Sequence, residues 1–418
     1  MTKRLILAFV FLSWHLVACS NGDSGISSGL PDKPSAEEDS PGTETISEEM
    51  RVKITGEDLY ISAKLDAKTD ILYWFKKCMF NELFTFYRVG TIDNNMPAPA
   101  TLPDASPTSL LNLAYSDNIG PFNITGYGWC GGNHPYLDEV TQTARNIGYR
   151  IYIDGKEIKT DLSTLTKEIK IEVINEIMNP SKADTSSGKT LLNEILCIET
   201  VNYSIYRNNI QVLVTHEFQN ESPVTVQMYY GMQSMFDKET HTLTANGKYV
   251  DWTVQKDVST FTKKEYPSFR RFIEKSANAY QSSYLFADGL GNHEEISDDD
   301  IIFIGNSSNK TYHKIIADRE HKKGDIIHWS GVYTWFKSPV SDDDDLLCYE
   351  GVIDNKKVLF IDCKKNVDRT IQLPVDYTKK SFTIIEKSKS ITITGNKVTA
   401  KGLRIVSDGS GSCVITFD

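Results

Sequence analysis

The sequence has few cysteines and no long apolar run beyond its start. Its 418 residues contain seven cysteines, with no Cys-X-X-Cys pair and no Cys/His spacing of a zinc site, so structural zinc is not expected. The formal net charge is -11, and no basic stripe or basic-aromatic interleaving occurs, which argues against nucleic acid as a partner. After the first twenty residues no apolar run reaches the length of a transmembrane helix.

The motifs of several enzyme classes are also missing. There is no P-loop, no Gly-X-Ser-X-Gly elbow and no His-Glu-X-X-His motif. The glycine-rich stretch from Gly126 to Tyr136 does not follow the Gly-X-Gly-X-X-Gly pattern, and no βαβ unit surrounds it. Acidic runs at 294–295, 298–300 and 342–345 offer carboxylates to Ca²⁺ but lack the spacing of a calcium loop. We therefore expect solvated loops there rather than Ca²⁺ sites, and no cofactor.

The first nineteen residues predict export. Met1-Thr2-Lys3-Arg4 is a short basic start, and the apolar run from Leu5 to Ala18 is too short to span a bilayer comfortably, as in a secretory signal. The run ends in Leu16-Val17-Ala18-Cys19, which resembles a bacterial lipobox. The resemblance implies cleavage before Cys19 and a lipid anchor on that residue. Ser20 rather than Asp follows, which by analogy favours the outer membrane. A plain signal peptide with a chance cysteine is the alternative.

Residues 20–50 predict a flexible tether. The segment is rich in Ser, Gly, Pro and Glu and nearly devoid of large apolar residues, so it cannot bury enough surface to fold. It carries eight acidic residues against one lysine, so much of the net charge belongs to it. We expect the folded part to consist of a large β-sandwich domain over 51–340 and a small C-terminal β domain over 346–418.

The composition of the folded part favours strands. Twenty Tyr and eighteen Phe are present, and β-branched residues recur throughout. Short alternating runs such as 191–206, 210–218 and 224–230, separated by turn residues, indicate an antiparallel meander. Residues 70–87 fit a helix face or a strand equally well, whereas 268–280, which follows Pro267 and has apolar residues at helical spacing, is predicted as a helix. We predict an all-β fold: a large antiparallel β-sandwich with one short helix and a smaller C-terminal β domain.

One disulfide can be argued from register. The segment from Cys348 to Cys363 is typical of a hairpin that turns within 354–357. If Asp354 faces Lys357, then Cys348 lies directly opposite Cys363, and opposed residues of an antiparallel pair are within disulfide reach. Two buried free thiols are the alternative.

The stretch from Gly126 to Tyr136 is the first candidate for a ligand site. It packs four glycines, three aromatics, an Asn and a His into eleven residues. Glycines allow positive φ and close approach, and loops often carry function. Trp129, Asn133 and Tyr136 are predicted to bind a ligand, with His134 as a general base or a hydroxyl-binding group. A tight turn between two strands is the alternative.

Three further residues are candidates for catalysis. Arg145 could pair with the carboxylate of an acidic sugar, or with a neighbouring acid in the chain. His216 and Glu217 are adjacent in a predicted strand, so their side chains point in opposite directions. Only the one that faces the concave side of the sheet can serve the site.

The next predicted strand adds ligand-binding candidates. Tyr229, Tyr230 and Gln233 combine rings with an amide, and sugar faces stack on rings while amides bind hydroxyls. Tyr229 and Tyr230 point apart, so one of them is expected in the core. His313 and Trp335 belong to a later, similar cluster.

The domain pattern resembles a known architecture. About 290 residues of meander before a smaller all-β tail are similar to the β-supersandwich of galactose-mutarotase-like proteins, which sugar epimerases, polysaccharide lyases and glycosidases share. The epimerases' His motif is not found in matching context. An exported lipoprotein of this make-up also resembles those that Bacteroidetes display for glycan capture.

The resemblances imply a function in the cell envelope. We expect a lipoprotein that is anchored in the outer membrane and faces the periplasm or the cell surface. We expect it to bind a carbohydrate in a β-sandwich cleft, and processing of that carbohydrate is left open. Whether it is an enzyme stays open. A polysaccharide lyase or glycoside hydrolase is one alternative, and a non-catalytic structural or adhesion lipoprotein is the other.

Overall fold

The computed structural model describes residues 46–102, 108–109, 119–236, 241–244, 247–251, 258–262, 270–286, 299–304 and 310–418, with only the backbone described at 109, 258–262 and 299–304. Within Glu44–Asp418 the chain forms one compact unit. The predicted signal peptide, Cys19 and nearly all of the tether lie outside the described residues. In the described part, no helix has the length and apolar character needed to cross a membrane.

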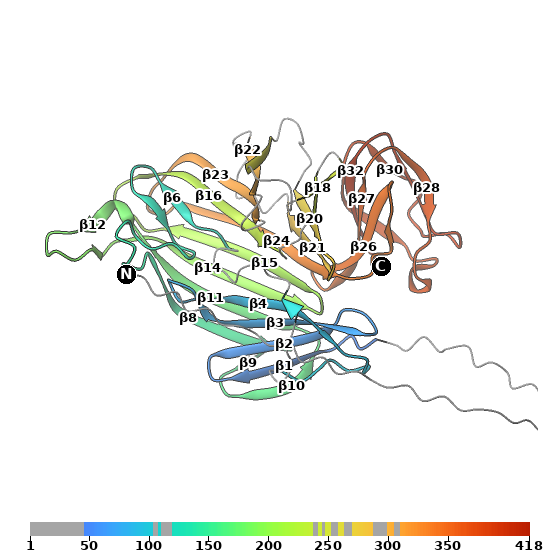
Figure 1. Cartoon of the computed structure of the whole chain (residues 1–418), viewed down its shortest axis with the longest axis horizontal. Helices are drawn as coiled ribbons and strands as arrows, with labels where there is room; N and C mark the ends of the chain where they lie inside the picture. Colours follow the sequence, from blue (N-terminus) through green and yellow to red (C-terminus); the bar gives the residue numbers. More distant parts are fainter. Residues whose placement is uncertain are drawn as a thin grey trace, which may run out of the picture. The chain divides into compact units, whose positions relative to one another are not determined.

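The predicted all-β fold is confirmed. Every strand pair among the described residues is antiparallel, and the largest sheet has ten strands. This ten-stranded sheet crosses the middle of Figure 1. In spatial order its strands are β18 (Tyr249–Asp251), β17 (His241–Leu243), β20 (Arg271–Lys275), β21 (Tyr280–Leu285), β24 (Ile326–Phe336), β15 (Asn209–Phe218), β14 (Ile195–Tyr206), β11 (Ile169–Met178), β8 (Ala144–Ile153) and β9 (Lys156–Ile158).

Two six-stranded sheets pack on the inner face of the ten-stranded sheet through one continuous core. The N-terminal sheet consists of β10 (Leu162–Thr166), β1 (Met50–Thr55), β2 (Asp58–Lys64), β3 (Thr69–Cys78), β4 (Leu83–Asp93) and β5 (Thr108–Ser109). The β16–β23 sheet consists of β19 (Val258–Thr262), β22 (Asp299–Ile304), β23 (Lys310–His321), β16 (Val224–Met235), β6 (Phe122–Ile124) and β7 (Gly128–Cys130). A small pair, β12 (Ala183–Asp184) and β13 (Leu191–Leu192), follows the 3₁₀ turn η2 (Pro180–Lys182).

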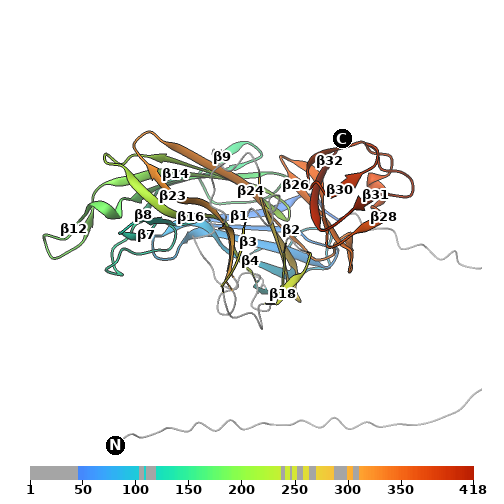
Figure 2. The ribbon, with the colours of Figure 1, turned by 90° about the horizontal axis from the view of Figure 1, so that it is seen from above.

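The C-terminal strands form two sheets with a core of their own. A second cluster, which includes Phe336 and Tyr349 with ring centroids 4.2 Å apart, packs them against the ten-stranded sheet. Figure 2 shows these orange and red strands gathered at one end of that sheet. The division at 340–346 stays a prediction. The strands are β25 (Ser341–Asp342), β26 (Leu346–Ile353), β27 (Lys356–Cys363), β32 (Gly411–Phe417) and β29 (Phe382–Lys387), then β28 (Val367–Ile371), β31 (Leu403–Ser407) and β30 (Ile391–Ile393), with the 3₁₀ turn η4 (Val375–Tyr377).

The predicted helix at 268–280 is wrong. Described residues of that segment form β20, a turn closed by the Ser276 N–H donating to the Ala279 carbonyl at 3.0 Å, and the start of β21. Phe272 and Ile273 are both buried, because β20 is covered on both faces. A strand buried on both faces shows no alternation, so its apolar residues can fall at helical spacing by chance.

The predicted disulfide is also wrong in this structure. Ile353 faces Lys356, so Cys348 lies opposite Ile361 and Cys363 opposite Leu346; both cysteines are buried free thiols. The residues between the strands, Asp354 and Asn355, take φ values of 49° and 58°. Two residues at positive φ make a tight two-residue hairpin turn, which shortens the loop and moves the register by two residues.

The free thiols give a first prediction. With the protein unfolded in denaturant without reductant, a maleimide should label both Cys348 and Cys363, because nothing joins the two sulfur atoms. Peptide mass spectrometry measures the labelling. If the two peptides are recovered as one cross-linked species that only a reductant separates, the protein contains the disulfide and the prediction is wrong.

Candidate functional site

The glycine-rich stretch is a turn held by buried polar side chains. The Asn81 side-chain N–H group donates to the carbonyls of Gly132 at 2.9 Å and of His134 at 3.1 Å, and the Thr143 hydroxyl also donates to His134. The Asn133 side-chain oxygen accepts from the backbone N–H of Phe80 at 2.7 Å. That oxygen of Asn133 therefore anchors the neighbouring turn of the N-terminal sheet.

The structure brings three of the predicted ring residues together. The Trp129 ring lies parallel to the rings of His134, at 5.3 Å, and Tyr230, at 5.5 Å, and Tyr230 contacts Tyr312 at 3.9 Å. Trp129 and His134 are partly exposed, as is Tyr136 in the same loop, whereas Tyr230 is 8% exposed. The rings cover one another, so much of their stacking surface is used within the protein.

Arg145, His216 and Glu217, the three strand residues predicted to be catalytic, do not lie together at one site. Arg145 is exposed and forms an ion pair with Glu176, while His216 is fully buried on the opposite, inner face of the ten-stranded sheet. Glu217 is exposed on the outer face. Arg145 and His216 therefore cannot act at one site in this structure.

His216 belongs to a chain of hydrogen bonds inside the core. Its Nε2 lies 2.9 Å from a Glu199 carboxylate oxygen, and the Asn175 amide donates to the other oxygen at 2.8 Å. Asn146 donates in turn to Asn175 at 2.9 Å. The rings of Phe122 and Tyr229 pack against the imidazole edge-on.

Tyr229 and Gln233 are also interior residues. Tyr229 is fully buried and donates its hydroxyl to the Ile119 carbonyl at 2.8 Å, while the Trp329 indole N–H donates to the same hydroxyl at 2.7 Å. Gln233 is 3% exposed, next to the positive-φ residue Met232 in a bulge of β16. Both Tyr229 and Tyr230 are therefore buried in the interior, although only one of them was expected there.

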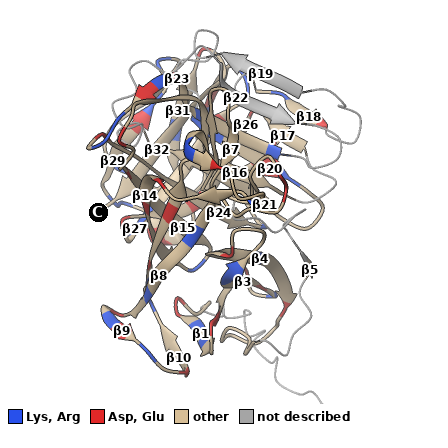
Figure 3. Cartoon of the chain, turned by 90° about the vertical axis from the view of Figure 1, so that its left-hand side faces the viewer, with Lys and Arg blue, Asp and Glu red and all other residues tan. Residues whose placement is uncertain are grey.

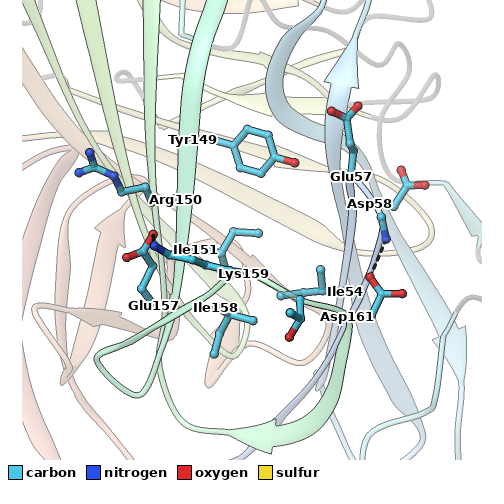
Figure 4. A pocket seen from close by; sticks show the side chains of 12 residues that line it. Ile54, Glu57, Asp58, Tyr149, Arg150, Ile151, Glu157, Ile158, Lys159 and Asp161 are labelled. Atoms are coloured by element: carbon cyan, nitrogen blue, oxygen red, sulfur yellow. Dashed lines mark hydrogen bonds and ion pairs between the residues drawn. The ribbon is translucent and has the colours of Figure 1, made fainter.

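A cavity of about 270 Å³ lies elsewhere, where two hairpins meet at the edge of the sandwich. One side is the turn between β1 and β2 of the N-terminal sheet; the other is the hairpin of β8 and β9, with the residues that follow it (Figure 4). We call it the edge cleft. Its lining residues are Ile54, Gly56, Glu57, Asp58, Tyr149, Arg150, Ile151, Glu157, Ile158, Lys159, Thr160 and Asp161.

One aromatic ring forms the apolar part of the edge cleft. Tyr149 is partly exposed and stacks on the buried ring of Phe84, with centroids 4.0 Å apart and an interplanar angle of 15°. Burial raises the pKa of Tyr149, and the carboxylates of Glu57 and Asp58 raise it further. The phenol is therefore a hydrogen-bond donor held in one orientation beside two acceptors.

The polar lining of the edge cleft carries charges of both signs. Asp161 accepts from the backbone N–H of Gly56 at 3.0 Å, which ties the two hairpins together (Figure 4). Lys159 pairs with Glu157 at 3.4 Å, and Arg150 pairs with Glu172 outside the cleft at 3.0 Å. The Tyr149 ring thus points toward the carboxylates of Glu57 and Asp58, whereas Arg150 points away from it (Figure 4).

Sequence reasoning missed the edge cleft entirely. Asp154 and Gly155, a residue pair that favours hairpin turns, form the β8–β9 turn, with Ile153 facing Lys156. The local sequence does not reveal that the turn before Asp58, about ninety residues earlier, meets this hairpin. Only the long-range pairing of β1 with β10, Met50 opposite Thr166, brings them together.

The described residues include no group of three or more His, Cys, Asp or Glu placed to hold a metal ion. Three acids of the run at 342–345 are used in ion pairs: Asp342 with Lys364 at 2.8 Å, Asp343 with Arg369 at 2.6 Å, and Asp345 with Lys365 at 2.9 Å. Residues 294–295 and 298 lie outside the described residues.

A second polar cluster, also missed, surrounds Glu274. This fully buried carboxyl group accepts from the hydroxyls of Ser234 and of Thr311, the latter at 3.3 Å, and burial raises its pKa to about 8. His313, on the same face of β23 as Thr311, has its pKa lowered to about 3 by burial, and its Nε2 has no hydrogen-bond partner among the described residues. The helix expected at 268–280 gave no sign that Glu274 is buried.

The raised pKa of Glu274 gives a second prediction. Between about pH 4.5, where Glu titrates in the unfolded chain, and about pH 8, the folded protein keeps a proton that the unfolded chain has lost. As the pH rises through that window, the free energy of unfolding should therefore fall by about 1.4 kcal/mol per pH unit, relative to a Glu274→Gln variant that does not titrate. Denaturant unfolding of both proteins measures it. Parallel pH profiles would show that Glu274 is ionised in the folded state.

Comparisons with known proteins show only distant likenesses of structure. No family model matches the chain, and no curated protein is similar to it in sequence. A GH36 alpha-galactosidase from Geobacillus stearothermophilus has a TM-score of 0.39 at 10% identity, over 69% of this chain and 41% of its own.

Two other solved structures match as weakly. A TPR-domain containing protein from Parabacteroides distasonis has a TM-score of 0.34 at 11% identity, over 68% of this chain and 48% of its own. A polysaccharide lyase has a TM-score of 0.27 at 6% identity, over 82% of this chain and 45% of its own. The chain thus spans less than half the length of each structure. Likenesses of this size carry no argument about activity.

Proposed function

We propose that this chain is a lipoprotein of the bacterial cell envelope that binds a carbohydrate in the edge cleft. The location rests on the resemblance of Leu16 to Cys19 to a lipobox and on Ser20 after it, which favours the outer membrane. The binding activity rests on the lining of the cleft, which is the single observation that carries the proposal.

A sugar ring has a flat C–H face and a rim of hydroxyl groups. The Tyr149 ring, fixed by Phe84, offers a surface for such a face, and Glu57, Asp58 and Asp161 offer acceptors for hydroxyls. A volume of about 270 Å³ is near the lower end of ligand cavities, which suits one sugar unit or the end of a chain. The excess of carboxylates favours a neutral sugar over an acidic one.

One observation favours the alternative of a glycoside hydrolase. Asp58 and Asp161 line the same cavity, and paired carboxylates are the groups that most glycoside hydrolases use. Neither His134 nor His216 lines it, so the earlier set of catalytic candidates takes no part in that alternative. We place binding first, because ring, acceptors and donors are sufficient for it.

A glycan-array screen of the purified protein, followed by calorimetry with the best neutral ligand, tests the proposal. Tyr149→Ala should weaken binding about tenfold or more through the lost ring contact, and Glu57→Gln about tenfold through a lost charged acceptor. Glu57 is 68% exposed, so its change should leave folding intact. Release of reducing sugar from the bound glycan would move the assignment from binding to hydrolysis.

Two matched variants serve as controls. Tyr127→Ala removes a ring that is 43% exposed in the glycine-rich turn, and Glu217→Gln removes an exposed acid of the outer face of the ten-stranded sheet. Both should bind as the parent protein does. Binding unchanged in Tyr149→Ala and Glu57→Gln but lost in Tyr127→Ala would return the site to the glycine-rich turn. Absence of any glycan ligand would favour a structural or adhesion role.

A further inference from the structure

A row of four side chains crosses the outer face of the N-terminal sheet. Lys53 of β1 faces Tyr60 of β2, Tyr60 faces Trp74 of β3, and Trp74 faces Arg88 of β4. All four are partly exposed. Neighbouring strands are about 4.8 Å apart, so the row extends over roughly 14 Å from one cation to the other. We call it the outer row.

The rings of the outer row form a compact aromatic group. Tyr60 stacks on Trp74 with centroids 5.3 Å apart, and Tyr87 meets Trp74 edge-on at 4.9 Å. The ammonium group of Lys76 lies 4.4 Å from the centre of the Trp74 ring and 4.2 Å from that of Tyr87. Cation–π attraction thus holds a third positive charge above the rings, where its remaining donors can reach a ligand.

The cations of this face lack acidic partners. Within the described part of the chain, none of Lys53, Lys76 and Arg88 is in an ion pair with a carboxylate. Elsewhere even exposed cations often have one, as Arg150 has in Glu172. Figure 3 shows the basic residues on β1 and β3 of this sheet. A local group of unpaired positive charges in a chain of net charge -11 is complementary to an anionic ligand.

We propose that the outer row binds an extended polysaccharide that carries carboxylate or sulfate groups. The cations at the two ends and above the rings pair with its charges, and the exposed parts of the rings between them pack against its sugar units. An extended chain is required, because a single sugar cannot reach from Lys53 to Arg88. Nucleic acid also combines charge with stacking surface, but the acidic balance of the whole chain repels a polyanion of its charge density.

The outer row adjoins the edge cleft but differs from it in charge. Asp58 links them, since it lines the cleft and accepts from the Trp74 indole N–H at 2.9 Å. Among the charged residues that line the cleft, carboxylates outnumber cations, whereas the outer row presents cations. An anionic polymer on the row therefore does not need the cleft, and the inference does not rest on the function proposed for it.

Binding of the intact protein to polygalacturonate, measured by biolayer interferometry, tests the inference. The protein should bind polygalacturonate and not neutral dextran, and the affinity should fall as salt is raised. Lys53→Gln/Arg88→Gln should weaken binding about tenfold, because two partly exposed charges are lost. Lys356→Gln/Lys389→Gln, which removes two exposed cations of the C-terminal part of the chain, should bind as the parent does.

Trp74→Phe adds a test of the ring contact that keeps an aromatic side chain at the position, and its affinity should also fall. Thermal unfolding checks that each variant is folded. Equal binding by the parent and the Lys53→Gln/Arg88→Gln variant would overturn the inference. So would tighter binding to a single-stranded oligonucleotide, or to vesicles of anionic phospholipid, than to polygalacturonate. Glu57→Gln, which is expected to weaken binding of a neutral glycan in the edge cleft, should leave binding of polygalacturonate intact. The two proposals can therefore be tested separately.

Discussion

The structure depends on burial of the inner face of the ten-stranded sheet. Rings from the N-terminal sheet cover it: Tyr73 meets Trp335 at 5.4 Å, Phe75 meets Tyr203 at 5.4 Å, and Phe86 meets Tyr333 at 5.6 Å. Each side chain of this size stabilises the fold by about 1.5–3 kcal/mol when it leaves water. The polar side chains of the same face must then find partners inside, as His216 and Glu274 do.

Burial of this inner face also determines where the two surfaces lie for which we propose binding. The hairpins at the edge of the sandwich are joined by the β1–β10 ladder and by the contact from Gly56 to Asp161, and polar groups line the space between them beside Tyr149. The outer face of the N-terminal sheet is only partly covered there, which leaves Trp74 and its neighbours accessible. The groups that we propose for binding thus lie where the core ends, on or next to strands that the core covers on one side.

Local sequence was sufficient for the fold class, but not for every turn and not for the sites. Alternation predicted the strand β15, in which Val212 and Val214 are buried and Leu213 is exposed, and it placed His216 and Glu217 on opposite faces. It left open which of the two faces the interior. The helix at 268–280 failed because β20 is buried on both faces. The disulfide failed because Asn355 accepts positive φ and shortens the turn. The edge cleft requires two hairpins far apart in sequence to meet, and no local pattern records that.

The most direct test of the account is a crystal structure of the protein with its best neutral glycan bound. The account predicts a sugar ring against Tyr149, with hydroxyls within hydrogen-bond distance of the carboxylates of Asp58 and Asp161. A glycan bound against Trp129 and His134, with the edge cleft empty, would contradict it.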